Sequence, residues 1–195
     1  VDRARRFLHQ PEIGRPLMIA GDFIVGFPGE TDADYECTRD LLERVRFKNN
    51  FIFQYSPRPG TTAYKRIPDD VPDDVKRWRC NDLLALQSQH SNEISHQQIG
   101  STLSVFVEGL SKRERKRAPK PANAVALTLA GRTMNDVPMV AATSAKRPQL
   151  SGRTDGDLIV CFDCPEGKAP DDLVGSIVNV RITDAHQLTL QGELA

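Results

Sequence analysis

Apolar residues in the first sixty positions fall into two runs with a helical period between them. Residues 17–25, LMIAGDFIV, form a nearly unbroken apolar run, which is typical of a strand covered on both faces in a parallel sheet. Residues 51–55 form the second run. Between them, apolar positions over residues 35–45 recur at helical spacing, and Thr31 precedes them as a candidate N-cap. The pattern therefore predicts a helix–strand–helix–strand order over residues 1–60, which is a parallel α/β arrangement.

The period changes near Gly100. Residues 75–98 predict one long helix, and Gly100 suits its C-terminal end. Beyond it, Leu103, Val105 and Val107 alternate with their neighbours, as in a strand. Further short β segments are expected at about 123–130, 137–142, 157–162, 177–183 and 187–193. Several short strands in so few residues predict a small antiparallel barrel.

Composition and charge narrow the class of protein. The chain has 195 residues, with 26 Lys and Arg against 26 Asp and Glu. No run approaches the ~20 apolar residues of a membrane span, and no signal peptide is recognisable at the start. We therefore expect a cytoplasmic protein with no membrane contact. Because the first residue is Val1 and not Met, we interpret the chain as a fragment or a processed product.

One short segment is strongly basic. Residues 112–120 carry six Lys and Arg against the single acid Glu114. Such a segment suits a polyanionic partner, or else it is a solvated loop.

The four cysteines predict neither disulfides nor a metal site. Cys37 and Cys80 fall in helical patterns as small apolar residues. Cys161 and Cys164 form one C-x-x-C pair, and one pair cannot supply the four ligands of a zinc or iron–sulfur site.

The loop after each predicted strand is a candidate binding site. In parallel sheets, ligands bind at the carboxyl ends of the strands. Gly26 and Gly29 would let a ligand approach the backbone, and Pro28 would stiffen the turn. Tyr55 and Arg58 stand at the equivalent end of the next strand. The alternative is a structural βα loop.

Asp22 is the only charged residue in the apolar run of residues 17–25. A carboxylate within an apolar strand costs several kcal/mol unless it is paired or hydrogen-bonded. It serves either a cofactor or substrate, or a structural partner such as an arginine.

Six segments carry a resemblance to a known family. In chain order they are GDFIVGFPGETDADYECTRDLLERVRF, FQYSPRPGTTAY, VPDDVKRWR, VFVEGLSKR, QLSGRTDGDLIVCF and LVGSIVNVRITDAHQLTLQGEL. In this order and over almost the whole chain they resemble the C-terminal part of the radical S-adenosylmethionine methylthiotransferases that modify tRNA. The family is usually short between the fourth and fifth segments, so residues 116–147 resemble an insertion.

The resemblance implies α/β plus all-β architecture in three parts. Residues 1–74 would be the C-terminal part of a radical S-adenosylmethionine partial (β/α) barrel. Residues 75–98 would be a connecting helix, and residues 99–195 a TRAM domain, a small, OB-like, RNA-binding β-barrel.

The resemblance also implies binding residues. Those matching the cofactor-side motifs are Asp22, Ile24, Gly26, Pro28, Glu30, Tyr55 and Arg58, of which Asp22 and Arg58 would make polar contacts. Candidate phosphate contacts are Lys112, Arg113 and Arg153. The cofactors would be S-adenosylmethionine and two [4Fe–4S] clusters whose ligands lie outside this chain, so no catalytic or metal-binding residue is assigned here.

The implied reaction belongs to the full-length enzyme. It adds a 2-methylthio group to N6-dimethylallyladenosine beside the anticodon of tRNA, through a 5′-deoxyadenosyl radical. Partners would be tRNA and an electron donor, and we expect a monomer. Without cluster cysteines this chain alone is expected to be inactive.

Alternative functions stay open. One is a methylthiotransferase for threonylcarbamoyl-adenosine in tRNA or for a ribosomal protein aspartate. An alternative of another class is a non-catalytic RNA-binding module.

Overall fold

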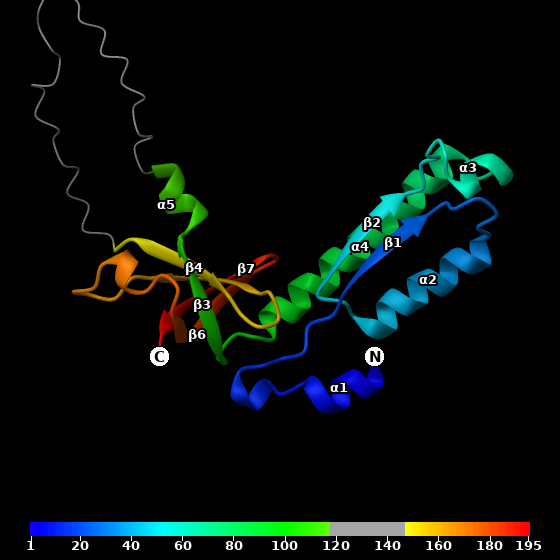
Figure 1. Ribbon diagram of the computed structural model, residues 1–195. Coiled ribbons are helices and arrows are strands. Elements are labelled where there is room, and N and C mark those ends of the chain that lie inside the picture. Colours follow the sequence, from blue (N-terminus) through cyan, green and yellow to red (C-terminus); the bar gives the residue numbers. More distant parts are fainter. Residues whose placement is uncertain (118–146) are drawn as a thin grey trace, which may run out of the picture.

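The computed structural model describes residues 1–117 and 147–195 (Figure 1). The first part contains α1 (Asp2–Leu8), η1 (Pro11–Ile13), β1 (Ala20–Val25), α2 (Asp32–Val45), β2 (Asn49–Gln54), α3 (Thr62–Arg66) and α4 (Asp73–His96). The second contains β3 (Thr102–Leu110), α5 (Lys112–Arg117), β4 (Gln149–Arg153), β5 (Ile159–Asp163), η2 (Pro170–Asp172), β6 (Ile177–His186) and β7 (Thr189–Leu194). Within these residues, no helix is both long enough and apolar enough to span a membrane.

The first part is a two-stranded parallel sheet with helices α2 and α4 on one face. Strands β1 and β2 pair in parallel, as the pattern predicts. Side chains alternate across the sheet, so Val25 and Ile52 are buried against the helices with Leu42 and Leu83. The prediction that the strand at 17–25 is covered on both faces is wrong for the described residues. The opposite face leaves Ile24 58% exposed and Phe53 54% exposed.

Helix α2 begins as the sequence predicts. The Thr31 hydroxyl accepts a hydrogen bond from the Asp34 amide at 3.2 Å, and the Asp34 carboxylate accepts one from the Thr31 amide at 3.0 Å. This capping box satisfies two amides of the first turn. The Tyr35 hydroxyl then donates to Asp82 on α4 at 2.6 Å, which ties the two helices together.

Helix α4 connects the two parts of the molecule and buries polar groups along its length. Gln87 bonds Asn50 at 2.6 Å and the main-chain oxygen of Phe47 at 3.0 Å, while Ser91 donates to the main-chain oxygen of Lys48 at 2.8 Å. These bonds need specific partners, so they determine the position of the helix along the strands. His90 of the same helix is also buried.

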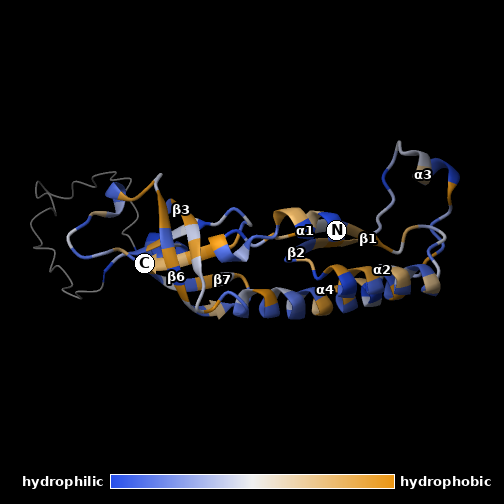
Figure 2. Cartoon of the chain, turned by 90° about the horizontal axis from the view of Figure 1, so that it is seen from below, coloured by the Kyte–Doolittle hydropathy of each residue, from blue (hydrophilic) through white to orange (hydrophobic). Residues whose placement is uncertain are grey.

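The second part is a closed barrel with strand order β3-β4-β5-β7-β6. The alternation at Leu103, Val105 and Val107 is confirmed, because all three side chains are buried in the barrel core. Figure 2 shows the resulting alternation of hydropathy along the strands. The sequence predicted an antiparallel barrel, and this prediction is wrong for one strand pair. Strands β5 and β7 pair in parallel, so the barrel is mixed.

One strand of the barrel was missed by the sequence prediction, and two predicted strands are not tested. Strand β4 was not predicted, because its five residues include Ser151 and Gly152 and show no clear alternation. Gly152 is required there, since a Cβ atom would lie 2.2 Å from the main-chain oxygen of Phe106. The predicted strands at 123–130 and 137–142, and nearly all of the predicted insertion, lie outside the described residues.

Two adjacent leucines on α4 offer a test of the core. Leu83 is fully buried against the sheet, whereas Leu84 is 42% exposed. We expect Leu83→Ala to lower the free energy of unfolding by about 2–5 kcal/mol, because it removes buried methyl groups and leaves a cavity. Leu84→Ala should cost less than about 1 kcal/mol. Urea denaturation followed by circular dichroism measures both, and equal losses would contradict the packing described.

Candidate functional site

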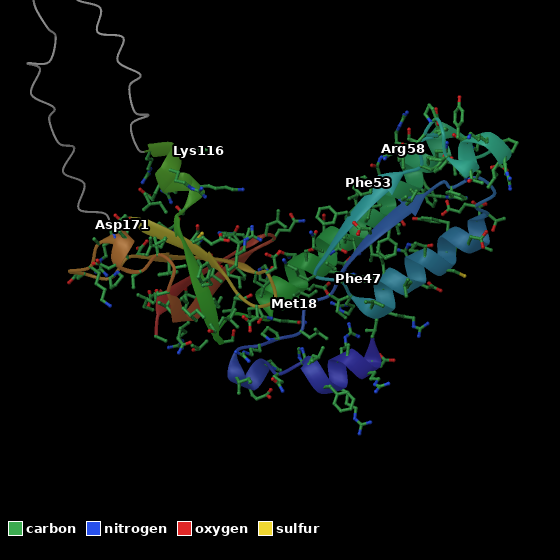
Figure 3. The ribbon with its side chains drawn as sticks, viewed as in Figure 1. Met18, Phe47, Phe53, Arg58, Lys116 and Asp171 are labelled. Carbon is green, nitrogen blue, oxygen red and sulfur yellow. The ribbon has the colours of Figure 1, made fainter. Side chains whose placement is uncertain are left out.

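A hollow of about 610 Å³ lies at the carboxyl ends of β1 and β2. It is lined by Asp22, Ile24, Phe27, Phe53, Gln54, Tyr55, Ser56, Arg58, Thr61 and Ala63. Figure 3 shows Phe53 and Arg58 at the end of the sheet farthest from the β-barrel. This is the position at which parallel sheets bind ligands.

The parallel register brings the lining residues together. Asp22 lies opposite Phe51, and Ile24 lies opposite Phe53, so all four share the exposed face of the sheet. Beyond the strands, the Phe27 and Tyr55 rings meet edge to face with their centroids 5.0 Å apart. The hollow therefore combines an apolar wall with the charged groups of Asp22 and Arg58.

Asp22 is exposed in this structure, so it bears no burial penalty. Its carboxylate has no ion-pair or hydrogen-bond partner within residues 1–117 and 147–195. The expectation of a buried carboxylate was wrong because it assumed that both faces of the strand are covered. The carboxylate is free to accept a hydrogen bond from a ligand in the hollow.

Gly26, Pro28 and Glu30 do not line the hollow, and Gly26 and Glu30 lie against α4 instead. The Glu30 carboxylate accepts a hydrogen bond from the Gly26 amide and pairs with the buried guanidinium of Arg79 at 2.6 Å. A Cβ atom on Gly26 would lie 2.3 Å from Lys76, and its φ of +71° also favours glycine. The neighbour that approaches this glycine is thus a lysine side chain.

Arg79 anchors the loop between β1 and α2. Its guanidinium is buried, and it pairs with Asp32 at 2.7 Å as well as with Glu30. Although burial opposes its charge, the bonds to Asp32 and Glu30 raise its pKa above the ordinary value. Arg79 of α4 therefore holds the loop that borders the hollow in place through Glu30 and Asp32.

Of the seven predicted cofactor-side residues, four meet in the hollow: Asp22, Ile24, Tyr55 and Arg58. The sequence reading missed Phe27 and Phe53. Phe53 could have been found from the alternation of β2, because it lies on the same face as Ile24. The contribution of Phe27 depends on its contact with Tyr55 and has no sequence signal of its own.

The predicted RNA-binding residues lie at two places on the barrel. Lys112 and Arg113 begin α5, directly after the end of β3. Arg153 ends β4 and lies opposite Phe106, whereas Leu150 at the other end lies opposite Leu110. The two sites are thus three to four residues apart along the paired strands β3 and β4, which is roughly 10–13 Å.

Their side chains also differ in what they contact. Arg113 lines a second hollow, of about 620 Å³, together with Arg147, Gln149 and Thr183. Arg153 pairs with Glu108 at 3.1 Å and with Asp157.

Cys161 and Cys164 are both buried, and burial raises the pKa of each thiol. Within the described residues, no three His, Cys, Asp or Glu side chains are grouped so as to hold a metal ion.

Comparison with known proteins identifies the relatives of this chain. No family model matches it. Proteins named tRNA-2-methylthio-N(6)-dimethylallyladenosine synthase match it closely: 40% identity over 176 residues in Rhodopirellula baltica, 36% over 178 in Polynucleobacter asymbioticus and 36% over 176 in Porphyromonas gingivalis. The matches cover 90%, 91% and 90% of this chain.

The chain is homologous to the C-terminal third of these tRNA methylthiotransferases. It spans 31%, 32% and 30% of the length of the three relatives. With nine tenths of the chain aligned, the methylthiotransferase relationship includes both the sheet and the barrel.

The buried Arg79 gives a test of the loop beside the hollow. We expect Arg79→Met to lower the free energy of unfolding by about 3 kcal/mol, because it leaves the nearly buried Glu30 carboxylate without its partner. Arg77→Met, an exposed arginine on the same helix, is the matched control and should change it by less than about 0.5 kcal/mol. Urea denaturation of both variants checks this. A similar loss for both would show that Arg79 does not anchor the loop.

Proposed function

We propose that this chain is the C-terminal part of a radical S-adenosylmethionine methylthiotransferase that adds a 2-methylthio group to N6-dimethylallyladenosine beside the tRNA anticodon. The observation that carries the proposal is the 34–40% identity to synthases of that name over nine tenths of the chain. That name favours this substrate over threonylcarbamoyl-adenosine or a ribosomal protein aspartate. The alignment of the sheet as well as the barrel favours an enzyme over a plain RNA-binding module.

The proposed domain organisation follows the family. Residues 1–74 are the end of a partial (β/α) barrel, residues 75–98 its connecting helix, and residues 99–195 a TRAM domain. In support, α4 ends at His96 and the first barrel strand begins at Thr102. The exposed apolar face of β1 and β2 suits the inner wall of a larger barrel, where further strands would exclude water.

The hollow fits S-adenosylmethionine by its chemistry. Ile24, Phe27 and Phe53 offer an apolar wall to the adenosyl group. Asp22 offers an acceptor for hydroxyl or ammonium groups, and Arg58 offers donors for a carboxylate. In the proposed enzyme, bound S-adenosylmethionine supplies the radical and the methyl group, and these residues orient it and exclude water.

Of the other three residues, Gly26 and Glu30 support the pocket through the loop that Arg79 anchors. Pro28 is buried in the same loop. The two [4Fe–4S] clusters of the proposed enzyme would be held by cysteines outside this chain, and an electron donor would reduce them.

A chimaera tests the function. We would replace the C-terminal third of the Rhodopirellula baltica synthase with this chain and measure methylthiolated tRNA by mass spectrometry. We expect activity on tRNA that carries N6-dimethylallyladenosine. A folded, cluster-loaded chimaera without activity on it would overturn the proposal, and activity on threonylcarbamoyl-adenosine instead would favour the alternative substrate.

Variants of the chimaera test the pocket. Asp22→Asn and Arg58→Ala should each lower kcat/KM for S-adenosylmethionine by about tenfold or more, since each removes a charged hydrogen bond. Asp74→Asn and Arg77→Ala alter exposed residues of α4 and serve as matched controls. If the pocket variants stay within twofold of the controls, Asp22 and Arg58 do not contact the cofactor.

The barrel residues can be tested in the 195-residue chain itself. We expect it to bind tRNA with an affinity that falls steeply with salt. Lys112→Ala combined with Arg113→Ala should reduce the slope of log K against log salt by about 1.8 if each residue neutralises one duplex phosphate. Fluorescence anisotropy over 50–300 mM salt measures the slope. An unchanged slope would exclude these two residues as phosphate contacts.

A further inference from the structure

The turn between β4 and β5 joins the barrel to the sheet. Residues 154–157 of this turn meet the segment that precedes β1 and the residue that precedes β2. Lys48 donates to the main-chain oxygen of Asp157 and pairs with its carboxylate at 3.2 Å. Arg15 pairs with Asp155 at 3.2 Å. The turn therefore makes two charged contacts across the seam between the two parts.

Packing reinforces these contacts. Met18 packs against the barrel core, and a Cβ atom added to Gly156 would lie 2.5 Å from its side chain. Figure 3 labels Met18 between the sheet and the barrel. The absence of a side chain at Gly156 thus allows the turn to lie flat on this segment.

The Asp157 carboxylate is shared between two cations. One oxygen accepts from Lys48, and the other accepts from Arg153, which itself pairs with Glu108 at 3.1 Å. The Arg153 guanidinium and the Lys48 ammonium lower the pKa of Asp157, which keeps the carboxylate charged. A chain of charges thus runs from the start of β2 through Asp157 to strands β4 and β3.

The turn holds Asp157 in place from within. Its amide donates to the main-chain oxygen of Thr154 at 2.9 Å, and the Thr154 hydroxyl accepts from the Leu158 amide at 3.1 Å. Asp157 has a φ of +58°, a conformation that Asp and Asn adopt more readily than most residues. The carboxylate is therefore presented by a defined turn.

The seam lies far from the hollow. Lys76, near the start of α4, contacts the Tyr55 ring at 5.7 Å, whereas Ser95 near its end donates to the main-chain oxygen of Gln187 in the barrel at 3.3 Å. The two residues are 19 positions apart, which corresponds to a rise of about 28 Å along the helix. Figure 1 accordingly shows the barrel and α3 at opposite ends of α4. A small change of angle at the seam would move the barrel far relative to the hollow.

We propose that Asp157 is a positioning residue: with Lys48 and Arg153 it clamps the barrel to the end of the sheet remote from the hollow. The clamp fixes the barrel as a second RNA contact at a set distance from the cofactor pocket. This consequence for RNA rests on the proposed function, whereas the clamp itself does not. In the clamp, the Arg153 guanidinium is paired with the carboxylates of Glu108 and Asp157.

Spin-label distances test the clamp without reference to activity. One label goes on the native Cys37, which is exposed on α2, and the other on Ile177→Cys, where the barrel residue is 71% exposed. The remaining three cysteines are buried. We expect a narrow distance distribution that Asp157→Asn broadens at least twofold. Asn keeps the size and the backbone preference of Asp and removes only the charge.

Two further variants make this result decisive. Lys48→Met removes the Lys48–Asp157 ion pair from the other side and should also broaden the distribution. Asp171→Asn, an exposed carboxylate of the barrel, should leave it unchanged. A distribution that stays narrow in both Asp157→Asn and Lys48→Met, or broadens in only one of them, would overturn the clamp.

Kinetics of the chimaera test the positioning role. We expect Asp157→Asn to raise KM for tRNA three- to tenfold and to leave kcat and KM for S-adenosylmethionine unchanged, because the pocket is untouched. Asp157→Glu, which retains the charge, should recover part of the loss. A broadened distance distribution with unchanged KM for tRNA would overturn the positioning role, and an inactive chimaera with a narrow distribution would count against the proposed function alone.

Discussion

The packing of α4 along the two-stranded sheet is the constraint on which the rest of the molecule depends. The helix buries Leu83 against the strands and also carries polar groups that must find partners. Arg79 reaches Glu30 beneath the loop at the hollow, and Gln87 reaches Asn50 near the start of β2. Since a buried polar group without its partner is costly, these bonds allow one register of helix on sheet.

That register determines what each end of the helix can do. At its start, α4 supports the loop that borders the hollow, through Arg79 and through Lys76 beside Gly26. At its end, it leads directly into the barrel, where Gly100 donates to the main-chain oxygen of Ile182 at 2.8 Å. The helix is therefore a rigid spacer between a candidate cofactor pocket and a candidate RNA-binding barrel. In the methylthiotransferase that we propose, such a spacer would let the substrate be held at two separated places.

The open face of the sheet and the seam between sheet and barrel differ in whether their side chains have partners. At the open face, Ile24, Phe51 and Phe53 each expose more than half of their surface, which is unusual for side chains in a sheet. At the seam, the Asp157 carboxylate pairs with both Lys48 and Arg153, and Arg153 also pairs with Glu108. The open face is suited to binding another polypeptide segment or a ligand. The seam is suited to holding the barrel against the sheet.

Local pattern determined most of the elements, although not β4, because helices, caps and strands depend on neighbours close in the chain. The Thr31 cap, the parallel pair and the alternation at Leu103, Val105 and Val107 could all be read from the residues themselves. Tyr55 and Arg58 could be placed at the hollow from their position after the second strand, whereas Asp22 was singled out as a carboxylate in an apolar strand and Ile24 only by resemblance to the family. Only the tertiary structure decided which face of β1 is open, that Glu30 turns to Arg79, and that Arg153 meets Asp157. The open face and the Glu30–Arg79 pair depend on how segments far apart in the chain pack together, and the Arg153–Asp157 pair depends on the turn of residues 154–157. No hydrophobic period along the sequence records any of these.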